Sequence, residues 1–246
     1  MDLVYRVLSA MDLPNDAASI FCGQTKPWSK KLEEAYLAAP GRLLVHGVGL
    51  ITEDLAGLLA LLRGERLTDL RDGAGKALAN LLGDILEAES ATCRPAWDAE
   101  AGARDRRRDA LAPWLPQLDA VFAALWKDSP SAPTTLIHDC PSLVTREGTH
   151  GRSMLWKGRL HLALGLGGPI EQVLCQLIHE ATHVATDPPI RAKHAGQRQD
   201  TQVASAAFSL HRELERAAVE LGDRLVAERA PRLKKAYDLW RRRHGC

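Results

Sequence analysis

The residues His179-Glu180-Ala181-Thr182-His183 bring together three side chains that can carry out hydrolytic chemistry on a metal ion. Two histidines four positions apart lie on the same face of a helix, roughly 6 Å apart. At that spacing two imidazoles can hold one Zn²⁺, each nitrogen about 2.0–2.1 Å from the ion. Glu180 could accept a proton from a metal-bound water. The pattern predicts a hydrolytic zinc site, provided that the segment is helical and a third ligand arrives.

The segment around this motif has the features of a buried helix. Pro169 suits the first turn of a helix, and Glu171 complements the positive end of the helix dipole. Apolar residues recur at helical spacing, at Ile170, Val173, Leu174, Leu177, Ile178 and Val184. We expect Pro188-Pro189 to end the helix, so that both histidines fall in its last two turns. The simpler alternative is two helical histidines beside a glutamate, with no metal.

A third protein ligand is required, and His194 is our first choice. If the helix ends at the two prolines, the following loop can fold back and bring His194 to the side of the histidine pair. Asp187 is an alternative that continues the four-residue spacing. It lies about 12 Å along the helix from His179, so it would bind only if the chain turned sharply after His183.

Glu213 is the other alternative ligand. It lies on a predicted long helix that spans about residues 201 to 228, and it would bind only if that helix crossed the histidine-bearing helix. Glu215 and Glu220 on the same helix are lesser options. The closely spaced third histidine found in some metallopeptidases is excluded, because position 186 is not glycine and position 189 is not histidine.

Two further kinds of residue could complete the site. Cys175 lies one turn before His179 and could close the metal site as a fourth ligand, although a cysteine beside two leucines on a helix is more often part of the core. A hydrolase also needs a hydrogen-bond donor for the oxyanion. His161 is the first candidate for that role, with His150 and His211 as alternatives, and its simpler role is a half-exposed strand residue.

Composition bounds the class of protein. The formal net charge of +1 over 246 residues does not support a nucleic-acid partner, although the C-terminal tail is locally basic. Five scattered cysteines without a Cys-x-x-Cys pair argue against a disulfide framework and against a thiolate zinc site. Neither a signal peptide nor a membrane-spanning stretch is recognisable. We therefore expect a cytoplasmic protein that has no association with a membrane.

The residue pattern changes from helical to β-prone at residues 129 to 133, Ser-Pro-Ser-Ala-Pro. Residues 1–130 read as a helical region, in which the segment 43–50 is ambiguous and could be a strand. Residues 131–246 read as an α+β core. It begins with short β-prone segments at 134–138 and a hairpin of 153–156 with 159–164, and the histidine-bearing helix and the long helix follow. The predicted fold class is thus α+β, mainly helical, with a small antiparallel sheet.

This order of elements resembles the zincin metallopeptidases. The segments Arg159-Leu-His-Leu-Ala-Leu164, Val173-Leu-Cys-Gln-Leu-Ile-His-Glu-Ala-Thr-His183 and His194-Ala-Gly196 are similar to the minimal SprT-like and WLM-like cores. The resemblance covers roughly residues 155 to 200. It implies that His179, His183 and His194 bind zinc and that Glu180 is the general base. It also implies that the strand before the helix is a sheet edge on which an extended peptide lies. Ala195 stands where those families have glycine.

The sequence therefore predicts a zinc-dependent metallopeptidase with a protein or peptide substrate. Two other functions remain open at this stage. One is a catalytically degenerate zincin-like scaffold that binds a partner through its helical region. The other is a nucleic-acid-associated protein that uses the basic tail, which the near-neutral net charge does not favour.

Overall fold

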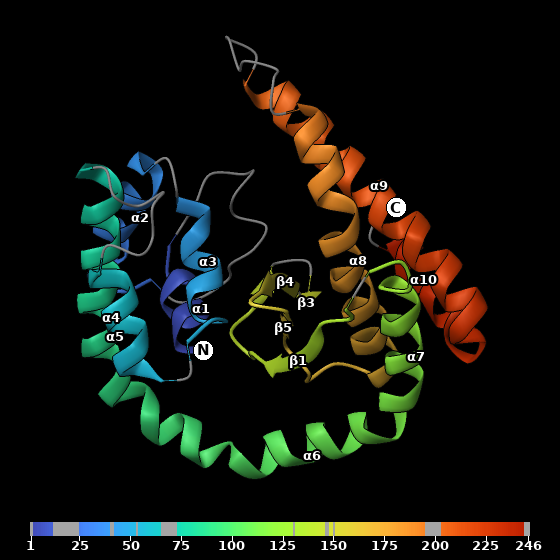
Figure 1. The fold of residues 1–246 in the computed structure, drawn as a ribbon. Coiled ribbons are helices and arrows are strands. Elements are labelled where there is room, and N and C mark those ends of the chain that lie inside the picture. The colour runs from blue at the N-terminus through green and yellow to red at the C-terminus, as the bar shows by residue number, and fades with distance from the viewer. Residues whose placement is uncertain are drawn as a thin grey trace. The chain divides into compact units, whose positions relative to one another are not determined.

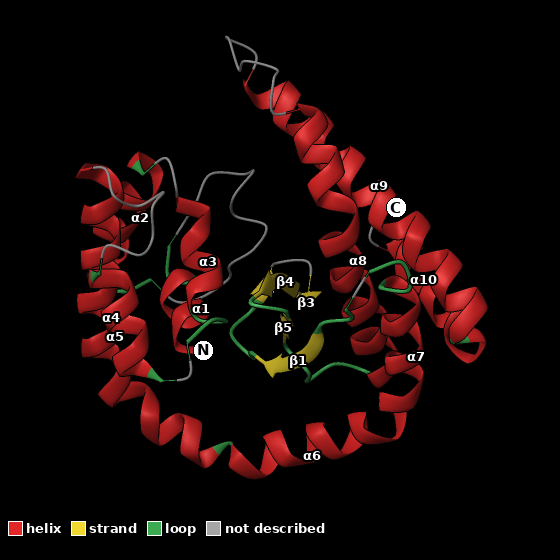
Figure 2. Cartoon of the chain, in the orientation of Figure 1, coloured by secondary structure: helices red, strands yellow, loops and turns green. Residues whose placement is uncertain are grey.

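The computed structural model describes residues 2–11, 25–39, 42–52, 54–64, 73–129, 131–145, 148–149, 151–194 and 203–243. Helices dominate these residues, and the strands form one three-stranded and one two-stranded sheet (Figure 2). The expected mainly helical α+β class is confirmed. None of the helices in the described ranges has the length and apolarity needed to cross a membrane.

The chain divides into two compact units that are not continuous in sequence. The first comprises residues 1–108, 137–152 and 163–167, and the second comprises residues 109–136, 153–162 and 168–246. The first change from one unit to the other falls at Arg108–Asp109, inside helix α6 (Ala101–Leu111). It precedes the stretch at 129 to 133 where the sequence indicates a boundary.

The first unit is built on α5 (Gly73–Ala99), a long amphipathic helix. Figure 1 shows α4 and α2 beside it, and both have residue contacts with it. The other helical elements of the unit are α1 (Asp2–Leu8), α2 (Ser29–Ala38), η1 (Arg42–Leu44), α3 (Val45–Val48) and α4 (Leu55–Arg63). Leu78, Leu82 and Leu86 of α5 are fully buried at helical spacing and form the centre of this core.

The ambiguous segment 43–50 proves to be helical in its described part, as η1 and α3. Its position is fixed by a buried polar group, since the imidazole Nε2 of His46 lies 2.8 Å from the hydroxyl of Tyr36. The hydroxyl of Tyr5 donates to the backbone carbonyl of His46 at 2.9 Å. These bonds satisfy polar groups inside the core. The pattern of apolar residues in the segment does not predict them.

The second unit holds the histidine-bearing helix α8 (Ile170–His194) between several partners. It has residue contacts with α9 (Val203–Arg229), α7 (Leu115–Leu125) and α10 (Lys234–Arg243), and the short turns η3 (Ala112–Trp114) and η4 (Pro231–Leu233) precede α7 and α10. Figure 1 shows α8 and α9 running side by side. The buried face of α8 includes Leu174, Leu177 and Ile178, as the apolar spacing predicts.

The α8 helix does not end at the two prolines, and this expectation is wrong. It runs from Ile170 to His194 and contains Pro188 and Pro189. The prolines deprive two backbone carbonyls of their usual donors, but both rings are exposed, so water can reach this turn. Asp187 also bridges the interruption, because it hydrogen-bonds to His183 one turn earlier and to Arg191 one turn later.

The predicted hairpin is confirmed as β4 (Gly151–Trp156) and β5 (Arg159–Leu164). Lys157 and Gly158 join the strands with φ angles of 47° and 72°, both in the left-handed region that a two-residue turn of this hand requires. A separate short pair, β2 (Val144–Thr145) with β3 (Gly148–Thr149), is antiparallel.

The three-stranded sheet has the order β1-β5-β4, with β1 (Thr134–Asp139) at one edge. Thr134 donates its N–H to the carbonyl of Gly158, and Cys140 donates to Leu164, so β1 and β5 advance together and are parallel. The sheet is therefore mixed, and the expected purely antiparallel sheet is wrong. The long connection from β1 to β5, which contains three strands, allows the parallel pairing that a tight turn would forbid.

Candidate metal centre

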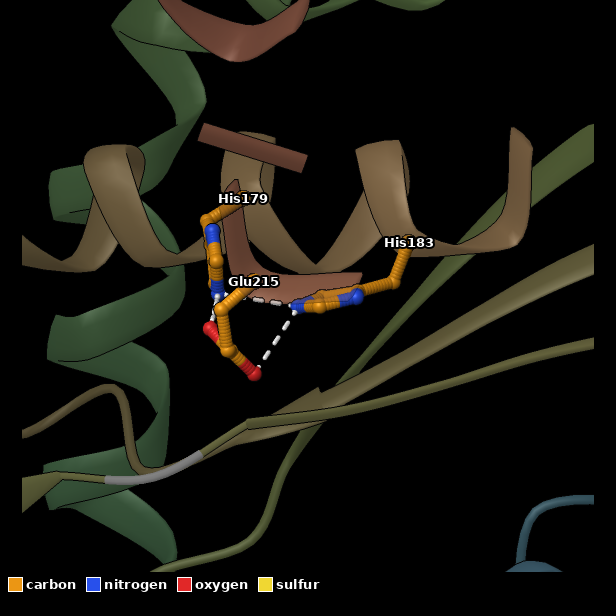
Figure 3. Close-up of side chains that lie close together, drawn as sticks. All are labelled: His179, His183 and Glu215. Carbon is orange, nitrogen blue, oxygen red and sulfur yellow. Dashed lines mark hydrogen bonds and ion pairs between the residues drawn. The ribbon is translucent and has the colours of Figure 1, made fainter. Parts of the chain in front are cut away.

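Three side chains of the second unit converge on one point, His179 and His183 from α8 and Glu215 from α9 (Figure 3). The Nε2 atoms of the two histidines are 3.0 Å apart. Glu215 places Oε2 at 3.2 Å from Nε2 of His179 and Oε1 at 3.5 Å from Nε2 of His183. The carboxylate thus faces both imidazoles, and one ligand atom of each residue points into a common space.

The separations are those of a group of side chains that could hold one metal ion. Four donors placed tetrahedrally about 2.0–2.1 Å from zinc are separated from one another by about 3.3–3.4 Å. The two imidazole nitrogens are 3.0 Å apart, and each is near a different oxygen of Glu215, at 3.2 and 3.5 Å, so all three separations lie around that value. Two histidines and a carboxylate leave a fourth position for water or substrate, as in catalytic zinc sites. The same donor set also suits other divalent metals, so the geometry by itself does not select zinc.

A hydrogen bond between α8 and α9 fixes the position of Glu215 along α8, opposite the two histidines. Thr182 is fully buried, and its hydroxyl lies 3.0 Å from the carbonyl of Ala218 and 2.6 Å from that of His179. Ala218 lies one turn after Glu215, so the bond holds that turn of α9 opposite the histidine pair. Thr182, one of the two variable positions of the motif, therefore belongs to the interface between the helices, and Ala181, the other, is buried.

The carboxylate and the imidazoles perturb one another strongly. Burial alone would lower the pKa of His183, but hydrogen bonds to Asp187 and Glu215 outweigh it and raise the pKa to about 10. Burial would raise the pKa of Glu215, yet its bonds to His179 and His183 hold that pKa far below the ordinary range. In the absence of a metal, a proton on His183 offsets the charge of the half-buried Glu215 carboxylate. A metal cation would take over that role.

Glu180 is on the same helix as the two histidines and only 7% exposed. The side-chain amide of Gln176, one turn earlier, donates to Oε1 of Glu180 at 2.9 Å. This bond occupies one oxygen of the carboxylate and leaves the other available to accept a proton. Gln176 therefore limits the orientations that the Glu180 carboxylate can take.

The outer surroundings of the two histidines differ. Nδ1 of His183 lies 2.9 Å from Oδ1 of Asp187. Nδ1 of His179 is buried and has no hydrogen-bond partner among the described residues. The ring of Trp240 on α10 lies 4.9 Å from the ring of His179 and packs against it instead. Gly222 allows this approach of α10, because a Cβ at that position would collide with the hydroxyl of Tyr237.

The structure does not bring His194, the first choice for the third ligand, into this cluster. His194 is the last residue of α8, roughly 16 Å along the helix axis from His183. Its Nε2 lies 2.9 Å from Glu213, which also pairs with Lys193 at 3.3 Å. His194 and Glu213, which the sequence suggests as alternative third ligands, thus bind each other. The reason is the unbroken helix, which carries His194 away from the histidine pair and removes the loop that would have returned it.

Glu215 is the residue that the sequence named only as a lesser option. The sequence does contain a signal for it, because the residues three and four positions later, Ala218 and Val219, are both apolar. A glutamate one turn before two apolar residues lies at the border of the buried face. Glu213 is followed at the same spacing by Arg216 and Ala217, of which only the second is apolar. Ranking the glutamates by this pattern would have favoured Glu215.

The remaining candidates lie outside the cluster. Cys175 is fully buried, and burial raises the pKa of its thiol to about 12, which suits a core residue better than a thiolate ligand. His211 is on α9, with Nδ1 at 3.8 Å from Oε1 of Glu215. His150 and the residues Ala195 and Gly196 of the expected third-ligand segment lie outside the described residues.

His161 is on β5 and 6% exposed, and burial lowers its pKa. The resemblance implied that the strand before α8 is a sheet edge, and this expectation is wrong. That strand, β5, is paired on one side with β1 and on the other with β4. An extended peptide therefore cannot add to β5, whose backbone groups are already used on both sides. His161 is a buried residue of a central strand and not the half-exposed residue of the simpler interpretation.

Comparisons with known proteins add no assignment to this geometry. No family description, curated protein or solved structure matches the chain.

Proposed function

We propose that the protein is a zinc-dependent metallopeptidase. The observation that carries this proposal is the convergence of His179, His183 and Glu215, with Glu180 on the same helix. A general base next to a three-ligand metal site is the minimum equipment for hydrolysis by an activated water. The resemblance of the motif and its preceding hairpin to the zincins favours a peptide bond as the bond that is cleaved.

Each residue of the site has a separate role in the proposed hydrolysis. His179, His183 and Glu215 would hold the metal, which when bound supplies a water of lowered pKa and a Lewis acid for the carbonyl. Glu180 accepts the proton of the attacking water and returns it to the leaving amine. Gln176 holds Oε1 of Glu180 and so limits the orientations of the carboxylate.

The test is a comparison of metal content and peptidase activity in the wild-type protein and in Glu180→Gln. We expect about one zinc per chain in both proteins, measured by elemental analysis after removal of loosely bound metal. Cleavage of a quenched fluorescent peptide library should fall in the variant by roughly 10²–10⁴-fold, the usual contribution of a general base. Glu171→Gln, an exposed change on the same helix, is the matched control and should retain full activity.

Full activity in Glu180→Gln would contradict the role of Glu180. Absence of bound zinc in the wild-type protein would contradict the metal site itself. Bound zinc without cleavage of any peptide would favour the degenerate scaffold over the peptidase.

A further inference from the structure

Asp187 lies on the side of His183 that faces away from the metal cluster. Its Oδ1 is 2.9 Å from Nδ1 of His183, whereas the Nε2 atom of the same ring is the one that meets His179 and Glu215. The side chains of His183 and Asp187 are only 14% and 19% exposed. A carboxylate at Nδ1 accepts a hydrogen bond from Nδ1–H, which keeps the proton on that nitrogen and leaves the lone pair of the neutral ring on Nε2.

A second contact holds the carboxylate in place. Arg191, one turn further along α8, approaches the other oxygen of Asp187 at 3.2 Å. The pairs His183–Asp187 and Asp187–Arg191 therefore form a chain of side chains along one face of the helix, across the turn that Pro188 and Pro189 interrupt. The carboxylate is thus oriented from both sides and is aimed at the ring nitrogen.

We propose that Asp187 is a positioning residue for the metal, which fixes the tautomer and the orientation of His183 so that Nε2 is presented as a ligand. This inference rests on the proposed metal site. Asp187 acts through His183 and does not itself bind the ion, because its contact is with the nitrogen that points away from the cluster. His179 has no equivalent partner at Nδ1 among the described residues, and this makes His183 the better oriented ligand of the pair.

Zinc affinity measures this role directly and does not depend on any catalytic activity. We would titrate metal-free full-length protein with Zn²⁺ in competition with a chromophoric chelator. We expect Asp187→Ala to weaken zinc binding by roughly 10–100-fold, the usual effect of removing an outer partner of a ligating histidine. Asp187→Asn keeps an oxygen that can accept from Nδ1–H, so its loss should be smaller. His183→Ala sets the level for the loss of a true ligand.

Asp238→Ala is the matched control. Like Asp187, Asp238 forms an ion pair within its own helix, with Lys234 one turn earlier at 2.6 Å. This variant should bind zinc like the wild-type protein. A proton resonance of His183 Nδ1–H far downfield in the zinc-bound protein, absent in Asp187→Ala, would provide a second readout that a merely structural role would not produce.

The zinc titrations distinguish a positioning role of Asp187 from a direct ligand role and from no role in metal binding. Unchanged affinity in Asp187→Ala would overturn the positioning role, while the wild-type titration would still support the metal site. A loss as large as that of His183→Ala would overturn it differently, by making Asp187 a direct ligand. If Asp187→Ala does not fold, Asp187→Leu decides, because it removes the acceptor but fills a similar space, and wild-type zinc affinity in that variant would overturn the proposal. A wild-type protein that binds no zinc would refute the proposed function as well.

Discussion

At the scale of single residues, His183 has a carboxylate at each ring nitrogen, and the two carboxylates differ in role. Glu215 approaches Nε2 from a different helix, and Asp187 approaches Nδ1 from the same helix. Sequence spacing alone makes Asp187 look like a third ligand, because it continues the series of His179 and His183. The direction of the ring distinguishes the two carboxylates, since only Nε2 points at the partner histidine.

Glu215→Ala should reduce zinc affinity more than about 100-fold, beyond the usual effect of losing an outer partner, because a direct ligand is removed. His194→Ala should leave zinc affinity unchanged, because His194 pairs with Glu213 away from the cluster. The two variants would be compared by the same chelator competition. Loss of zinc in His194→Ala with retention in Glu215→Ala would contradict this assignment and would restore the third ligand that the sequence favours.

At the scale of elements, the site depends on two helices held in register. The α8 helix supplies both histidines, Glu180 and Asp187, and the contact of Thr182 with Ala218 fixes the position of α9. The continuation of α8 through two prolines is unexpected, because each proline removes an N–H from the helix. The cost is limited by the exposure of this turn and by the side-chain bonds of Asp187 that span it.

Replacing both prolines with alanine, in Pro188→Ala/Pro189→Ala, should increase the free energy of unfolding. Each proline inside a helix costs about 3 kcal/mol, and the more flexible unfolded chain of the variant recovers only about 0.4–1 kcal/mol of that per site. Urea denaturation followed by circular dichroism would measure the change. Pro169→Ala, before the first turn of the same helix, is the control and should change stability little. An unchanged or lower stability of the double variant would indicate that the prolines end the helix.

At the scale of the whole molecule, the candidate site belongs entirely to one of the two units. His179, His183, Glu215, Glu180 and Asp187 all lie in the unit that contains residues 168–246. The other unit has its own core around α5 and its own buried polar group at Tyr36 and His46. Metal binding should therefore stabilise one unit directly, through mass action on the folded state that holds the ion.

Hydrogen exchange with and without zinc tests this expectation. At a free zinc concentration about 100 times the dissociation constant, the stabilisation is about 2.7 kcal/mol, so amides that exchange by opening of the site should slow by about 100-fold. We expect this protection in α8 and α9, and unchanged exchange in α5. The zinc-binding variant Glu180→Gln should show the same protection as the wild-type protein. Equal protection of α5 would indicate that the two units open together.

The sequence by itself determined the features that depend on neighbouring residues. Helical spacing places His179, Glu180 and His183 on one buried helix, and alternation with a glycine-containing turn gives the β4–β5 hairpin. Both follow from local backbone geometry, which repeats every 3.6 or every 2 residues. The length of α8 was beyond this reasoning, because the penalty of Pro188 and Pro189 competes with packing and side-chain bonds that the sequence does not display.

Only the tertiary structure decided the third ligand and the order of the strands. Glu215 is 32 residues beyond His183, and its place opposite the histidines depends on how α8 and α9 meet, through Thr182 and Ala218. The central position of β5 likewise depends on a distant strand, since β1 pairs with it in parallel across a long connection. A local pattern specifies which residues share a face, but the contact between two faces is a property of the folded chain.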